Sequence, residues 1–66
     1  MLRLRNHICV SGCKEEKAIL KALSDLGFEL TIYEFGEVRR ISYGADDYDY
    51  KRVMTKYQFE LKELNA

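Results

Sequence analysis

Two runs rich in β-forming residues, 28–35 and 37–43, meet at Gly36, and this is the clearest pattern in the chain. Gly36 comes first in a two-residue turn with Glu37, as a type II′ β-turn requires. The register that follows from this turn pairs Phe35 with Val38, Tyr33 with Arg40 and Ile32 with Ile41.

This register separates the side chains into an apolar and a polar face, as expected for a sheet that is buried on one side. The apolar face contains Phe28, Leu30, Ile32, Ile41 and Tyr43. The polar face contains Glu29, Thr31, Tyr33, Arg40 and Ser42. We therefore predict that Ile32 lies opposite Ile41 and that both are buried.

A third strand is predicted for residues 2–10, where apolar and polar residues alternate. One face carries Leu2, Leu4, Ile8 and Val10, and the other carries Arg3, Arg5, His7 and Cys9. We expect the apolar face of this strand to lie toward the core. Asn6 interrupts that face, which indicates an edge or a polar partner at the middle of the strand.

A helix is predicted for residues 14–26, which repeat apolar residues at helical spacing. Gly27 follows where a left-handed conformation commonly ends a helix, and Phe28 can then contact Leu23 as in a Schellman motif. Ser11 is the expected N-cap at the other end. The apolar stripe of this helix consists of Ala18, Ile19, Ala22, Leu23 and Leu26.

The C-terminal segment carries two patterns. After a loop over residues 44–47 that ends in an acidic N-cap, spacings of four and three residues form a helical seam. The seam consists of Tyr50, Met54, Tyr57, Leu61 and Leu64. Within residues 56–64, however, three apolar side chains alternate with polar ones, as they would in a strand. We favour the helix because its seam is longer, and we leave a strand open.

Together these elements predict an α+β fold in the order βαββα, a two-layer domain with a three-stranded sheet and two helices on one face. A single domain is expected over residues 1–66. The predicted helix, followed after Gly27 by the hairpin, is similar in layout to dsRNA-binding-like domains and to small toxin RNases of the HicA type. Those RNases rely on a His on a strand, and the hairpin here contains none, so the sequence assigns no family.

Composition narrows the possible functions. The chain has 66 residues with 11 basic and 11 acidic side chains, so it lacks the net charge that attracts a polyanion at long range. Its longest stretch without a charged residue or His, 8–13, is too short for a membrane span. Its two Cys fit a reducing compartment as free thiols, so we expect a cytoplasmic protein. A chain of 66 residues can bury only a small hydrophobic core, which also favours association with another chain.

His7, Cys9 and Cys13 come closest to a ligand cluster, and their N and S atoms suit zinc. The set lacks a fourth ligand, so we expect neither a metal nor a cofactor. Cys13 at a helix start could act as a nucleophile with His7 as its base, but the strand separates them. The turn at residues 11–13 could hold an anion, yet it lacks the P-loop and dinucleotide spacings. The chain is therefore expected not to be an enzyme.

Two surfaces are candidates for binding a macromolecule. If residues 2–10 pair beside the hairpin, they complete a basic and aromatic sheet face of the kind that stacks unpaired bases. This nucleic-acid alternative uses Arg3, Arg5, Tyr33 and Arg40. The favoured surface is an apolar patch beside the turn, on the uncovered side of the sheet. Together with an exposed aromatic from the acidic run 46–50, its partner-binding residues are Tyr33, Phe35, Val38, Arg40 and Tyr48.

From this patch we expect a non-enzymatic protein-binding module that acts through its exposed sheet face and hairpin tip. A small regulator or inhibitor of the kind that bacteria and phages encode fits such a chain. The expected partner is a second copy of the chain, as a dimer at micromolar concentration, or a host protein.

Overall fold

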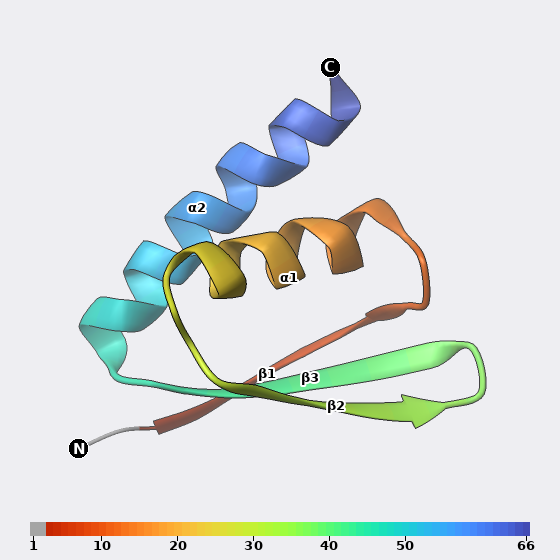
Figure 1. The fold of residues 1–66 in the computed structure, drawn as a ribbon, viewed down its shortest axis with the longest axis horizontal. Helices are drawn as coiled ribbons and strands as arrows, with labels where there is room; N and C mark the ends of the chain where they lie inside the picture. The colour runs from red at the N-terminus through yellow and green to blue at the C-terminus, as the bar shows by residue number, and fades with distance from the viewer. Residues whose placement is uncertain (1–2) are drawn as a thin grey trace.

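The computed structural model describes residues 3–66, with side chains from residue 4 onward, and Leu2 of the predicted strand lies outside this range. The elements are β1 (Arg3–Val10), α1 (Lys14–Asp25), β2 (Leu30–Phe35), β3 (Val38–Ala45) and α2 (Asp47–Asn65). The strands form one antiparallel sheet in the order β1-β3-β2. Both helices lie on one face of this sheet (Figure 1), which confirms the predicted α+β fold. We call the opposite side of the sheet the outer face.

The hairpin between β2 and β3 has the predicted register, with Phe35 opposite Val38 and Ile32 opposite Ile41. Gly36 has a φ of +65°, the left-handed conformation that the turn requires. Ile41 is fully buried, but Ile32 is 41% exposed. The prediction that both are buried is wrong for Ile32, because β2 lies at the edge of the described sheet, beside β3.

The end of α1 and the start of α2 follow the signals that the sequence contains. Gly27 ends α1 with a φ of +80°, and the Phe28 N–H donates to the Leu23 carbonyl at 3.0 Å, as in a Schellman motif. Asp46 is the N-cap of α2, where its Oδ1 accepts from the Asp49 N–H at 2.7 Å. The C-terminal segment is therefore the favoured helix and not a strand.

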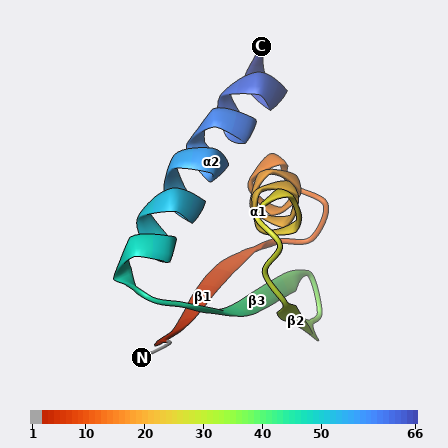
Figure 2. The ribbon, with the colours of Figure 1, turned by 60° about the vertical axis from the view of Figure 1, so that its left-hand side comes forward.

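A small core lies between the helices and the central strand β3. Figure 2 shows α1 and α2 side by side above the sheet, with α2 extending beyond it. The buried cluster consists of Ile19, Leu23, Ile41, Tyr43, Ala45 and Val53. No helix within residues 3–66 is long and apolar enough to cross a membrane.

Candidate functional site

Strand β1 faces the opposite way from the prediction. Its register with β3 places Arg5 opposite Tyr43 and His7 opposite Ile41, so both polar residues lie on the side of the helices. The expectation that the apolar side of this strand faces the core is therefore wrong. Its three described apolar side chains lie on the outer face and are largely exposed: Leu4 78%, Ile8 66% and Val10 57%.

Contacts with α2 account for this orientation. The Arg5 guanidinium lies 4.3 Å from the centre of the Tyr50 ring and forms an ion pair with Asp47. The His7 ring meets the Tyr57 ring edge-on, with 5.2 Å between their centres. Long side chains of β1 thus pack against α2, and two of their polar atoms, Arg5 Nε and His7 Nε2, are buried there without a hydrogen-bond partner among the described residues.

The same orientation divides the residues of the nucleic-acid alternative. Tyr33 and Arg40 are cross-strand partners on the outer face, whereas Arg5 lies on the opposite side, against α2. The expectation that Arg5 and His7 share a face with Tyr33 and Arg40 is wrong, because the pairing of β1 with β3 fixes which face each residue occupies. The Arg3 side chain lies outside the described part of the chain.

At the hairpin end, the outer face presents two cross-strand rows of side chains. One row contains Val10, Val38 and Phe35, and the next contains Ile8, Arg40 and Tyr33. We call these six residues the tip patch. All six are exposed, and five of them are apolar. An apolar group of this size on one face is typical of an interaction surface.

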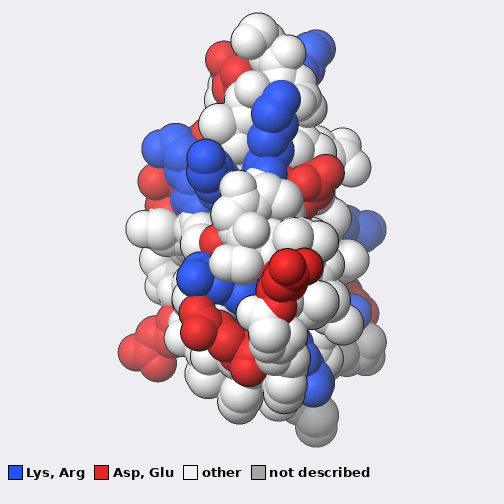
Figure 3. Space-filling view, turned by 90° about the vertical axis from the view of Figure 1, so that its right-hand side faces the viewer, with Lys and Arg blue, Asp and Glu red and all other residues white. Residues whose placement is uncertain are grey.

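The outer face is also hollowed. A shallow depression of about 840 Å³ includes Leu4, Asn6, Tyr33, Phe35, Arg40 and Ser42 among its lining residues. Figure 3 shows the molecule from the hairpin end, where basic and acidic side chains intermingle over most of the visible face. The lining of the depression combines apolar side chains with a few polar and charged ones, Glu29 and Arg40 among them, which is a usual composition for a binding site.

Tyr48 is the one predicted partner-binding residue that the structure does not bring to the outer face. It lies in α2 and is 71% exposed. There it lines a separate depression of about 570 Å³ together with Leu26, Arg52 and Phe59. Its role in binding a partner stays a prediction.

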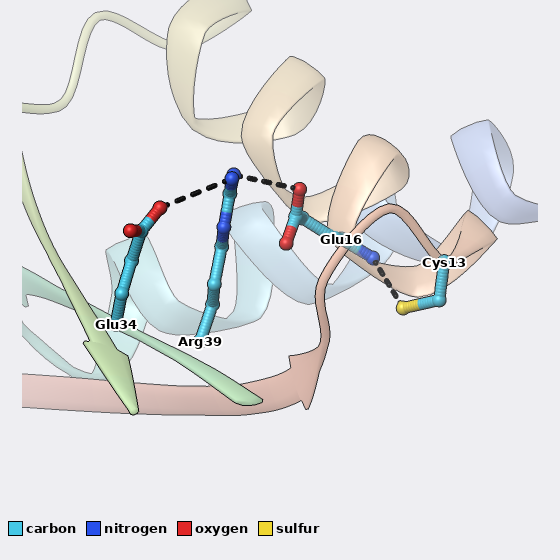
Figure 4. A network of polar contacts seen from close by, with 4 residues as sticks. All are labelled: Cys13, Glu16, Glu34 and Arg39. Carbon is cyan, nitrogen blue, oxygen red and sulfur yellow. Dashed lines mark hydrogen bonds and ion pairs between the residues drawn. The ribbon is translucent and has the colours of Figure 1, made fainter. Parts of the chain in front are cut away.

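A polar network on the helix-facing side joins the hairpin to α1 (Figure 4). Arg39 of β3 lies between Glu34 of β2, at 3.1 Å, and the buried Glu16 of α1, at 3.0 Å. The N-cap of α1 is Cys13, whose Sγ accepts from the Glu16 N–H at 3.3 Å. Ser11 was the expected cap, but it lies in the preceding turn, where its N–H donates to the Glu37 carbonyl at 2.8 Å.

The thiols and the single His are poorly placed for catalysis. Burial, aided by the neighbouring Cys13 thiol, raises the pKa of Cys9 to about 11, so Cys9 is protonated at neutral pH. Burial also lowers the pKa of His7, against the opposing effect of Glu15. No hydrogen bond joins His7 to either thiol among the residues that the structure describes. Nor does any group of three His, Cys, Asp or Glu within residues 3–66 have a geometry that could hold a metal ion.

When the chain is compared with protein-family models, curated proteins and solved structures, none of them matches it. The outer face and its chemistry are therefore the features that indicate a function.

Proposed function

We propose that this chain is a non-enzymatic protein-binding module, a small regulator or inhibitor, whose binding surface is the outer face and the adjoining hairpin tip. A single observation carries the proposal. The apolar residues that alternate along β1 point away from the helices of their own chain. Alternation of this kind places apolar side chains on a buried face, so a partner is required to bury this one.

The hairpin extends the same surface. Phe35 and Val38 join Val10 in one row across all three strands, so the exposed apolar area is continuous and not scattered. Covering a large apolar side chain fully contributes about 1.5–3 kcal/mol, which makes a patch with five of them a substantial source of affinity. Isolated exposed apolar residues would carry no such argument.

The absence of catalysis is part of the proposal. The Sγ of Cys13 caps α1 by accepting a hydrogen bond from Glu16 N–H. The pKa of Cys9 is raised to about 11, so little of its reactive thiolate form is present at neutral pH. His7 is packed against Tyr57 without a hydrogen bond to a nucleophile among the described residues. Cys13→Ser keeps a side chain that can cap the helix, so we expect it to leave partner binding unchanged.

Two kinds of partner can bury such a face, a second copy of this chain and a different protein. Both associate mainly through apolar contact, so their affinity is expected to fall with salt much less than the affinity for a nucleic acid. Nucleic acid, the alternative class of partner, would lose affinity steeply as salt rises, because phosphate contacts release counterions. Titrations at two salt concentrations therefore distinguish the classes.

Site-specific photo-crosslinking tests the proposed surface. A photoreactive benzoylphenylalanine replaces Phe35 on the tip patch or, as a control, Phe59, an exposed aromatic on α2. In the cell that makes the chain, we expect the first to form a discrete protein adduct and the second to form none. A third position, Tyr48, reports whether the partner also reaches α2. An adduct at Phe59 alone, or none at Phe35, would contradict the proposal.

A further inference from the structure

Arg40 is the only charged residue of the tip patch. It lies on the central strand, between Ile8 of β1 and Tyr33 of β2, and Val38 precedes it on the same face of β3. A partner that covers the tip patch must therefore also cover this guanidinium. An apolar partner would leave the charge buried and unpaired, which is strongly unfavourable.

Within the described residues, the Arg40 guanidinium donates hydrogen bonds along one edge only. Asn6 Oδ1 accepts long hydrogen bonds from Arg40 Nε, at 3.4 Å, and from Nη2, at 3.3 Å. The same oxygen accepts from the Ser42 hydroxyl at 2.7 Å. A guanidinium has five N–H donors, so Nη1 and the second N–H of Nη2 remain. These two nitrogens form the end-on fork that binds a carboxylate through two parallel hydrogen bonds.

The other arginines whose side chains the structure describes already have carboxylate partners. Arg5 pairs with Asp47 and Arg52 pairs with Asp49, while Arg39 lies between two glutamates. For Arg40, by contrast, the partners within the described residues are the amide oxygen of Asn6 and no carboxylate. The missing anion is therefore expected from outside the chain.

A second copy of the chain supplies this anion poorly. A two-fold interface centred on the tip patch brings residues near the axis against their own copies. Arg40 occupies the middle of that patch, so two positive charges would approach each other, and the tip patch itself contains no acidic residue. Glu34 is the acid next to Tyr33 and Phe35, but it lies on the helix-facing side, paired with Arg39. Glu29 also lines the depression, but it precedes β2 and so lies at the end of that strand away from the tip patch and from such an axis.

We propose that the outer face binds a segment of a different protein in which one Asp or Glu stands between apolar side chains. The carboxylate takes the end-on fork of Arg40, and the apolar side chains cover Val10, Phe35 and Val38. This inference rests on the proposed function, because it names the chemistry of the partner for the same surface. The depression of about 840 Å³ beside Arg40 provides room for such a segment.

Selection from a phage-displayed library of random peptides tests the inference. Library members are selected on the folded chain, and the enriched peptides are then synthesised and measured by fluorescence polarisation. We expect enriched peptides to carry one acidic residue with apolar neighbours. Replacing that acid by Gln in the peptide should weaken binding at least tenfold.

Matched variants of the chain test whether the carboxylate of the peptide binds Arg40. Arg40→Gln should weaken the binding of the acidic peptide at least tenfold and should leave the binding of the Gln-containing peptide nearly unchanged. Arg40→Glu should shift the selection toward peptides with Lys or Arg at the same place. Arg52→Gln, which removes an arginine of α2, should change neither result. Circular dichroism confirms that each variant is folded.

The outcomes separate this inference from the function on which it rests. If the enriched peptides show no preference for an acidic residue but fail to bind the Phe35→Ser variant, the inference is wrong and the outer face remains the proposed binding surface. Peptides that bind Phe35→Ser unchanged would overturn both. A selection that enriches no peptide contradicts the inference, and so does a dimer at micromolar concentration that Phe35→Ser dissociates in sedimentation experiments.

Discussion

Charged and titratable side chains lie between the sheet and the helices in places where apolar residues would be expected. Glu16 is almost fully buried, and one of its oxygens pairs with Arg39 at 3.0 Å. His7 packs in a half-buried position against Tyr57. Each of these groups depends on a partner or on its neutral form, because a buried charge without compensation is unfavourable.

Removing the charge of Arg39 should therefore destabilise the fold. Arg39→Met keeps the aliphatic stem but leaves the Glu16 carboxylate buried without its cation, and we expect a loss of about 2 kcal/mol in the free energy of unfolding. Urea denaturation measures this loss. In a Glu16→Gln background the same substitution should cost clearly less. An equal cost in both backgrounds would show that the ion pair is not its source.

Stability should also fall on mild acidification because of His7. Burial lowers the pKa of His7 in the folded chain below its ordinary value, so the unfolded chain binds a proton first as the pH decreases. The contribution of neutral His7 is complete above about pH 6.5 and is lost as the pH falls through the lowered native pKa.

Melting temperatures between pH 7.5 and pH 5, about one unit or more either side of the ordinary His pKa, check this expectation. His7→Phe keeps an aromatic ring against Tyr57 without a titratable group, so its melting temperature should depend less on pH over this range. Identical pH profiles for the two proteins would contradict a lowered His7 pKa.

At the scale of the elements, the sequence predicts local structure well and the orientation of β1 poorly. Gly36 and Gly27 occupy positions with positive φ, so turn and cap chemistry places the hairpin and the end of α1. The alternation in β1 identifies a strand, but it does not say which face the helices cover. That choice depends on the register with β3 and on the contacts of Arg5 and His7 with α2, which are distant in sequence.

The hairpin turn is the element most open to a direct test. Gly36→Val should lower the free energy of unfolding by about 1 kcal/mol or more, because a β-branched residue is strained at positive φ. An added Cβ would meet no atom within 4 Å, so the loss would come from the backbone and not from a clash. Gly36→Asn should cost less, since Asn tolerates the left-handed region better. A melting temperature that Val leaves unchanged would contradict the turn conformation.

On the scale of the whole molecule, apolar side chains lie on both faces of the sheet, and the two helices cover only one of these faces. The sequence predicted Tyr33, Phe35, Val38 and Arg40 as binding residues, and the structure gathers these four on the outer face. It could not predict the contribution of β1, because Leu4, Ile8 and Val10 have the pattern of core residues. Only the long-range pairing of β1 with β3 shows that their apolar face lies outside.

Calorimetric titration of the crosslinked partner tests the central claim, that the outer face buries its apolar side chains against another protein. Tyr33→Ala with Phe35→Ala should weaken binding by about 2 kcal/mol or more for each residue, roughly 30-fold apiece, because a few aromatic residues usually carry most of an interface's energy. The native chain should also show a negative heat-capacity change on binding. The control variant Phe59→Ala should bind like the native chain. Normal binding by the double variant, or a loss confined to Phe59→Ala, would contradict the account.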